Sequence, residues 1–336
     1  MRLIISFILL SLIFSCTDFN SMPDVSDIKI NISTQRFEKD FFSMDTVQIE
    51  KSIHLLDSRY PTFSSNFLNT ILNIDLTWGK DNCEQYIKNY ISSYRKIYDS
   101  VEKIFGDFSK TENQIKQSLQ YLKFYFPTYK APSKVITYIG PLDGYGDIIT
   151  DDAFVIGLQH HLGRNSSFYN DTRLLETYPS YLIFQFTPEH IVINCMKNVL
   201  SDMNPDVKSE SALHIQMIEQ GKRLYILEKL IPDADPSEII GYSENQLKDC
   251  YKHEAEIWSL FIQNDLLQTI DKNLIKNYIG ESPKTQELGE NAPGNIGAFV
   301  GWQIVKKFMK KKSDTKLLDL MNMDAESLFE AAKYKP

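Results

Sequence analysis

Histidine and acidic side chains are the groups of this chain that could do metal chemistry, and it contains six histidines. A zinc peptidase helix carries H-E-x-x-H, which places two imidazoles on one Zn²⁺ and leaves the glutamate to take the proton of a water. His253-Glu254 begins such a motif, but Ile257 stands where the second histidine would be. His160 and His161 are adjacent, so on a helix they would point about 100° apart and would not easily share one ion. The other three stand alone, and we expect structural or surface histidines, no metal and no cofactor.

The first residues of the chain offer a different chemistry, which is lipid attachment at Cys16. Arg2 precedes an apolar run at residues 3–14 that only serines interrupt. This run is shorter than the roughly 20 residues that span a bilayer, and with the small Ser15 it is typical of an export signal that is removed. Its final cysteine resembles that of a bacterial lipoprotein signal, in which the cysteine carries palmitate-type acyl chains. We expect a signal peptide at residues 1–15 and an exported protein anchored through Cys16; the alternative is an ordinary signal peptide with a chance cysteine.

Sequence motifs for nucleophilic or phosphate chemistry are missing. The chain contains no G-x-S-x-G, no G-x-x-x-x-G-K-[ST] and no G-x-G-x-x-G. Gly144-Tyr145-Gly146 is typical of a turn between strands. Three cysteines remain besides the anchor, and this odd number cannot form a closed disulfide framework. We expect these to be buried small side chains, and their disulfide state stays open: Cys83, Cys195 and Cys250.

Composition limits the kinds of partner. The 336 residues are 43% hydrophobic and 24% charged, as in globular proteins. A net charge of −8 argues against nucleic acid, whose phosphates are bound by clustered lysine and arginine, and against docking of the whole body on anionic lipid. No second apolar run reaches membrane-spanning length, so acyl chains alone would form the anchor. We expect an anchor and tether at residues 16–27 and a single, predominantly helical globular domain at residues 28–336.

Hydrophobic periodicity predicts an α+β fold that is predominantly helical and has a small central sheet. The alternation of Ile28, Ile30 and Ile32 with polar residues predicts a strand. Residues 133–139 and 153–158 are rich in β-branched and aromatic residues and predict an antiparallel pair. Apolar residues at three- and four-residue spacing predict helices at residues 45–57, 63–74, 83–105, 111–126, 188–203, 209–230, 244–267, 296–312 and 325–333.

Several segments resemble a known family, the GldB-type gliding motility lipoproteins, over nearly the whole mature chain. They are FPTYK (126–130), KVITYIG (134–140), VIGLQHHLG (155–163), LKDCYKHEAEIWSLF (247–261), PGNIGAFVGWQIVKKFM (293–309) and YKP (334–336). In the most specific of these, Gly297 and Gly301 are four residues apart and predict the close approach of another helix. The resemblance implies a role in surface gliding and in the envelope machinery that exports and drives cell-surface adhesins.

A second, more distant resemblance is to a family of predicted zinc-dependent proteases. In that family an H-E-x-x-H helix precedes a helix that carries E-G. In this chain the motif would fall at Asn194-Cys195-Met196-Lys197-Asn198, so that Asn194 and Asn198 replace the histidines and Cys195 replaces the glutamate. Neutral amides are poor zinc ligands, and no general base remains for the water. The resemblance implies a zincin-like scaffold that lacks its metal site.

We therefore expect a non-catalytic lipoprotein of the gliding and secretion machinery, which binds other envelope proteins and faces the periplasm. Whether the inner or the outer membrane holds its anchor stays open. One alternative is an envelope hydrolase with an unrecognised site built from His160, His161 or the pair His253-Glu254. The other alternative is an unrelated ligand-binding or assembly lipoprotein. Metal analysis would separate the first alternative from our expectation, and a motility assay of a deletion strain would separate the second.

Overall fold

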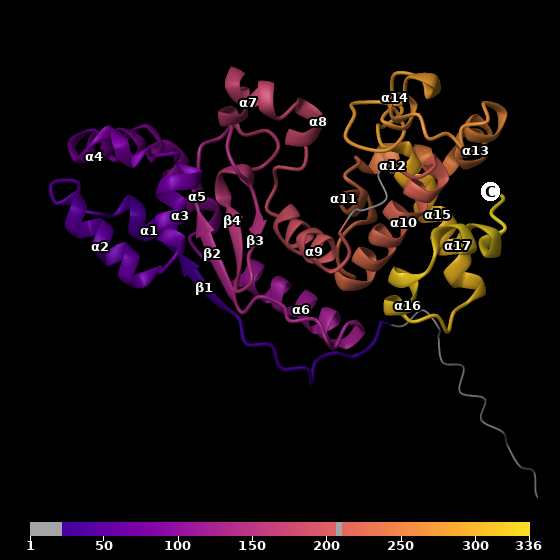
Figure 1. Ribbon diagram of the computed structural model, residues 1–336, viewed down its shortest axis with the longest axis horizontal. Coiled ribbons are helices and arrows are strands. Elements are labelled where there is room, and N and C mark those ends of the chain that lie inside the picture. The colour runs from indigo at the N-terminus through magenta and orange to yellow at the C-terminus, as the bar shows by residue number, and fades with distance from the viewer. Residues whose placement is uncertain (1–21, 206–209) are drawn as a thin grey trace, which may run out of the picture.

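The computed structural model describes residues 22–205 and 210–336, so the expected anchor at Cys16 lies outside the described residues. Figure 1 shows a small sheet with helices on either side along the long axis of the molecule. Helices α1 to α5 lie at one end, and α10 to α17 lie at the other. This arrangement confirms the α+β fold that is mostly helical and has a small sheet.

Four strands form the sheet in the order β1-β2-β4-β3. Their bounds are β1 Ser33–Arg36, β2 Lys134–Tyr138, β3 Ile148–Ile149 and β4 Ala153–Gly157. Both β1 and β4 run parallel to β2, whereas β3 is antiparallel to β4. The expected antiparallel pairing of residues 133–139 with 153–158 is therefore wrong. After β2 the chain first runs back along the outer edge as β3, and β4 then enters between β2 and β3 in the direction of β2.

The strand expected at residues 28–32 is also wrong, because the first strand begins one residue later, at Ser33. Ile28, Ile30 and Ile32 are half-buried and pack against the core, which accounts for their alternation. The carbonyl oxygen of Ile28 accepts a hydrogen bond from the Gln120 side chain at 2.8 Å rather than from a neighbouring strand. Alternating burial thus occurs here in a segment without strand pairing.

Helices of the first half surround an aromatic core. Phe37 packs edge-on against Phe63 and Phe67 at ring-centroid distances of 4.9 and 4.8 Å, and Tyr138 of β2 meets the same two rings. The helices are α1 Phe37–Phe42, α2 Ile49–Arg59, α3 Phe63–Asn66, the π-helical η1 Phe67–Ile71, α4 Lys80–Ser93, α5 Arg95–Phe105 and α6 Ser109–Tyr125. Tyr94 interrupts the helix expected at residues 83–105, which is divided into α4 and α5.

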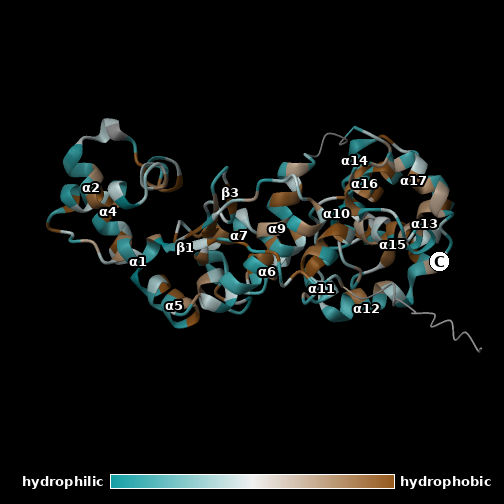
Figure 2. Ribbon diagram, turned by 90° about the horizontal axis from the view of Figure 1, so that it is seen from below, coloured by the Kyte–Doolittle hydropathy of each residue, from teal (hydrophilic) through white to brown (hydrophobic). Residues whose placement is uncertain are grey.

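The second half is helical almost throughout, as the periodicity predicts. Its helices are α7 Thr172–Thr177, α8 Ser180–Ile183, α9 His190–Met203, α10 Leu213–Leu230, α11 Pro236–Ile240, α12 Glu244–Lys252, α13 Glu254–Gln263, α14 Lys272–Ile275, α15 Ile296–Lys311, α16 Leu317–Asn322 and α17 Ala325–Ala332. The helix expected at residues 244–267 is two helices, which meet at His253. Figure 2 shows hydrophobic and hydrophilic residues alternating along these helices, as amphipathic packing requires.

Helices α10 and α15 make the closest helix contact in the second half. A Cβ on Gly301 of α15 would lie 1.7 Å from the carbonyl oxygen of Met217, and one on Gly221 of α10 would lie 2.2 Å from the carbonyl carbon of Gly301. A Cβ on Gly297 would lie 2.9 Å from the carbonyl oxygen of Tyr278. The two helices therefore touch backbone to backbone at Gly221 and Gly301, which fixes the position of α10 beside the cavity described below, whereas Gly297 approaches the backbone of Tyr278, outside α10. In residues 22–205 and 210–336, no helix is both long enough and apolar enough to cross a membrane.

Candidate functional site

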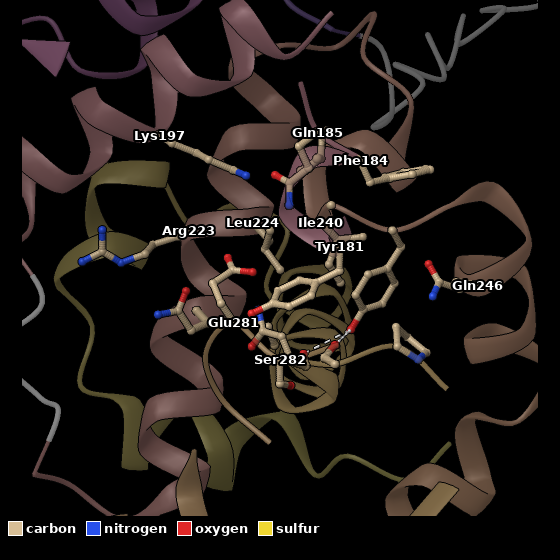
Figure 3. Close-up of a pocket in the computed structure, with 18 of the residues that line it drawn as sticks. Tyr181, Phe184, Gln185, Lys197, Arg223, Leu224, Ile240, Gln246, Glu281 and Ser282 are labelled. Atoms are coloured by element: carbon tan, nitrogen blue, oxygen red, sulfur yellow. Dashed lines mark hydrogen bonds between the residues drawn. The ribbon is translucent and has the colours of Figure 1, made fainter. Parts of the chain in front are cut away.

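A cavity of about 630 Å³ lies among α8, α9, α10, α11 and the segment that precedes α15. We call it the α9–α10 cavity. Such a volume is that of a small-molecule site. Figure 3 shows Lys197 of α9 and Gln185 pointing toward each other, with Glu281 below them. Tyr181, Phe184, Leu224 and Ile240 supply its apolar and aromatic walls.

Helix geometry decides which residues of α9 and α10 face this cavity. Lys197 and Ser201 are one helical turn apart on α9, and both line it. Gln220 and Arg223 line it from α10, next to the glycine contact with α15. Lysine, serine and glutamine on these faces are poor ligands for Zn²⁺, which takes imidazole, thiolate or carboxylate. Within the described residues, no three histidine, cysteine or acidic side chains are grouped so that they could hold a metal.

Lys197 is the charged group that points into the cavity from α9. Burial lowers the pKa of its ammonium group, and the attraction of Glu281 opposes that shift only in part. Across the described part of the chain, Lys197 forms no hydrogen bond and no ion pair. Arg223 differs, because its guanidinium donates a hydrogen bond to the carbonyl oxygen of Asn204. In Figure 3 its side chain points away from Lys197 and Gln185.

An adjacent strip of α9 carries the expected degenerate metal positions, and two of them hydrogen-bond to Asp147. Asn194 donates to Oδ2 of Asp147 at 2.8 Å, and Asn198 donates to its carbonyl oxygen at 3.2 Å. Nε2 of His161 lies 2.9 Å from the same carboxylate, and the backbone N–H of Gly157 donates to it at 3.1 Å. The structure thus brings Asn194 and Asn198 together on one residue, Asn194 at the carboxylate of Asp147 and Asn198 at its backbone carbonyl oxygen, and not in the cavity.

Electrostatics make Asp147 and His161 a buried ion pair. Burial alone would raise the pKa of Asp147, but the charge of His161 and the hydrogen bonds of His161, Asn194 and Gly157 outweigh it, so the pKa is lowered. For His161, burial would lower the pKa, but the attraction of Asp147 and hydrogen bonds to Asp147 and Thr187 raise it. We call these four residues with their shared carboxylate the Asp147 network: Asp147, Gly157, His161 and Asn194.

Two further buried histidines are held neutral. His160 stacks on Phe186 with ring centroids 4.5 Å apart, and its Nε2 lies 2.8 Å from the carbonyl oxygen of Leu142. Burial lowers its pKa to about 4. Nδ1 of His190 lies 3.0 Å from the Thr187 hydroxyl, and burial with nearby positive charge lowers its pKa to about 3. Both side chains are buried, and Nε2 of His190 has no hydrogen-bond partner in the described structure.

We predict that stability falls as the pH drops from 6.5 toward 4. His160 and His190 have native pKa values below the ordinary 6.5, so the unfolded chain binds protons that the native protein does not. Each contributes a loss that approaches about 1.4 kcal/mol per pH unit once the pH is well below 6.5, because the unfolded histidine is then protonated and the native one is not. Denaturant unfolding at several pH values between 6.5 and 4.5 measures this slope.

His190→Gln should lower that slope by about 1.4 kcal/mol per pH unit, because it removes one of the two groups. The matched control is His54→Gln, since His54 is an exposed histidine on α2. An unchanged slope in His190→Gln, or an equal change in His54→Gln, would contradict the assignment.

The remaining candidate residues lie apart from the cavity. His253 is partly exposed, and its Nδ1 lies 2.8 Å from Glu256, whereas Glu254 accepts from the hydroxyl of Tyr334. Cys195 and Cys250 are buried free thiols, and Cys83 is a half-buried free thiol. Burial raises the pKa of Cys250 to about 12 and raises the pKa of Cys195 well above its ordinary value, so neither is a reactive thiolate at neutral pH.

Sequence reasoning missed the residues that shape both sites. Asp147 directly follows the expected turn at Gly144-Tyr145-Gly146, and Gln185 and Glu281 have no motif around them. Lys197 appeared only as an intervening residue of the degenerate motif. The one usable signal was spacing. Lys197 and Ser201 are four residues apart, as the two histidines of a metal helix are. Lys197 follows Asn194 by three residues, and Ser201 follows Asn198 by three.

Comparison with known proteins gives a single result. The family model described as gliding motility protein GldB matches residues 18–336. No curated protein and no solved structure matches the chain. Because the family model covers the whole described body, the chain belongs to the GldB gliding motility family.

Proposed function

We propose that the protein is a lipid-anchored, non-catalytic component of the gliding motility apparatus and its associated secretion machinery. In this proposal acyl chains on Cys16 hold it at a membrane, and its body faces the periplasm and contacts other envelope proteins. Membership of the GldB family over residues 18–336 supports the gliding role. The anchor rests on the sequence pattern that ends at Cys16.

The non-catalytic part of the proposal rests on two adjacent strips of α9. Asn194 and Asn198 are hydrogen-bonded to Asp147, and Lys197 and Ser201 line the cavity. Neither strip offers the pair of imidazoles that a peptidase helix needs for Zn²⁺. This arrangement favours a binding role for the cavity over metal-assisted hydrolysis.

A deletion strain complemented with variants tests the proposal. We predict that Cys16→Ala leaves an unprocessed or unanchored protein and abolishes gliding, because stable membrane attachment takes two or more acyl chains. The measurements are palmitate labelling, membrane fractionation and colony spreading. Wild-type labelling and spreading by Cys16→Ala would refute the anchor.

His253→Ala is the matched variant for the hydrolase alternative. His253 is 43% exposed at the side chain, so its loss should leave folding and gliding intact if the protein is non-catalytic. Elemental analysis of the full chain in detergent should find well under one zinc per chain. A stoichiometric zinc that is lost, together with gliding, in His253→Ala would establish the hydrolase alternative instead.

A further inference from the structure

We propose that the α9–α10 cavity binds an organic carboxylate on an apolar body, such as the free carboxyl end of a peptide, with Lys197 and Gln185 as the carboxylate-binding groups. This inference goes beyond the proposed function, since a gliding component acting only through surface contacts needs no such cavity.

The first argument is the state of Lys197. In Figure 3 its ammonium group points into the cavity toward the Gln185 amide, and both residues are half-buried. Among the described residues neither side chain forms a hydrogen bond, so both are available as donors. Withdrawal from water disfavours the charged lysine, and an anion beside it would restore the lost stabilisation. A cation held in this way is a site for an anionic group.

The second argument is a further buried polar group of the cavity lining, the hydroxyl of Ser282. Oγ of Ser282 is buried and has no hydrogen-bond partner in the described structure. A Cβ on Gly294 would lie 1.9 Å from the carbonyl oxygen of Ser282, so glycine is required there for the two backbone segments of the cavity wall to approach each other. Buried polar groups are normally satisfied, and one that lines a cavity indicates a missing partner from water or a ligand.

The third argument concerns the placement of the positive and negative groups. Glu281 also lines the cavity, and its charge attracts Lys197 although the two form no ion pair in the described structure. Glu281 is exposed at the rim, whereas Lys197 is set deeper. A ligand would thus meet a cation at depth and a hydrogen-bond acceptor nearer the opening. A peptide end fits this order, because its carboxylate would seat on Lys197 and a preceding N–H would face Glu281.

The fourth argument is the shape and lining of the cavity. About 630 Å³ is room for a small molecule or a few residues and not for a folded domain. Tyr181, Phe184, Leu224 and Ile240 offer apolar contact to the body of the ligand. Tyr242 is committed to the fold, since its hydroxyl donates to the carbonyl oxygen of Gly294 at 2.8 Å. The cavity therefore has fixed walls and a few free polar groups, as ligand sites do.

Thermal shift and titration calorimetry on the full chain in detergent test the inference. The probes are a pool of N-acetylated tetrapeptides of apolar residues with free C-terminal carboxylates, the same pool with C-terminal amides, and 4-phenylbutyrate. We expect the free-acid pool to raise Tm and the amide pool to have no effect. Response to 4-phenylbutyrate but not to the peptides would assign the same carboxylate site to small organic acids.

Lys197→Met is the decisive variant, because it keeps the length of the side chain and removes the charge. We expect it to weaken binding tenfold or more, as loss of a hydrogen bond to a charged group does. Gln185→Ala should weaken binding less, and Lys310→Met, at an exposed position of α15, should not change it. Absence of any carboxylate response in the wild type, an equal response to the amides, or full binding by folded Lys197→Met would overturn the inference. Gliding by Lys197→Met is scored separately, so failure here leaves the motility proposal to its own test.

Discussion

Gly301→Leu is expected to destabilise the protein by at least about 3 kcal/mol, because its side chain has nowhere to go. The obstacle is the carbonyl oxygen of Met217, 1.7 Å from where the first added carbon would stand. This atom belongs to the backbone of α10, which cannot rotate aside as a flexible side chain can. The two helices must separate, and Gly221 then loses its contact with Gly301 as well. A fall in Tm of about 5 °C or more, measured by circular dichroism, is the expected result.

Two other variants set the scale for this experiment. Lys310→Leu adds an apolar side chain to the same helix at an exposed position and should change stability by no more than about 0.5 kcal/mol. Gly301→Ala adds only the first carbon and should already cost a large part of the effect. A melting temperature for Gly301→Leu that equals or exceeds that of the wild type would exclude the packing role of this glycine.

Most helices were predictable from sequence because their burial follows a period that a sequence displays. In α5, Ile97, Val101 and Phe105 are buried four residues apart. In α6, Pro127 stops the helix near Tyr125. The breaks at Tyr94 and His253 were not predictable from sequence, because the apolar residues keep their helical spacing on both sides of each break.

Strand pairing was less predictable than strand position. The residues of β2 and β4 have the composition of strands, but composition does not record direction. The deciding element is β3, which has only two residues, Ile148–Ile149, and gives no periodic signal of its own. Because the chain first runs back along the edge of the sheet as β3 and then reverses again, β4 runs in the same direction as β2.

The candidate site was hidden from sequence because distant segments build it. Gln185, Lys197, Arg223 and Glu281 come from different elements and meet only after α9, α10 and the loop before α15 have packed. No short motif joins them. The glycines of α15, by contrast, were visible as an i,i+4 pair, since both contact residues lie on a single helix.

Helix α9 links the two parts of the site, because adjacent strips of its surface line the cavity and contact the Asp147 network. Lys197 lines the cavity, and Asn194 and Asn198 hydrogen-bond to Asp147. The hydrogen bonds to Asp147 therefore fix the rotation of α9 about its own axis. A substitution at Asp147 should therefore change the direction in which the Lys197 side chain points, although Asp147 itself does not line the cavity.

Asp147→Ala is accordingly expected to lower stability by about 3–5 kcal/mol. The substitution leaves the buried His161 imidazole and the Asn194 amide without their shared acceptor, and it removes the acceptor of the Gly157 N–H. Stability from the native Asp147 carboxylate, whose pKa is lowered, is present above the ordinary 3.8 and is lost as the pH falls through the lowered value. Asp147→Ala should therefore lack the stability that the Asp147 carboxylate contributes at neutral pH. It should also lack the loss of stability that protonation of Asp147 causes in the wild type at acid pH. Denaturant unfolding at neutral and at acid pH measures both.

Asp151→Ala is the matched control, since Asp151 lies in the turn between β3 and β4, close to Asp147 in the sequence, but is exposed. It should stay within about 0.5 kcal/mol of the wild type. Asp147→Asn combined with Asn194→Ala should be less destabilising than the sum of the single variants by about 1 kcal/mol or more, because the two side chains share one hydrogen bond. Additive effects of the two changes, or a loss for Asp147→Ala no larger than for Asp151→Ala, would show that the buried carboxylate does not hold α9 in place.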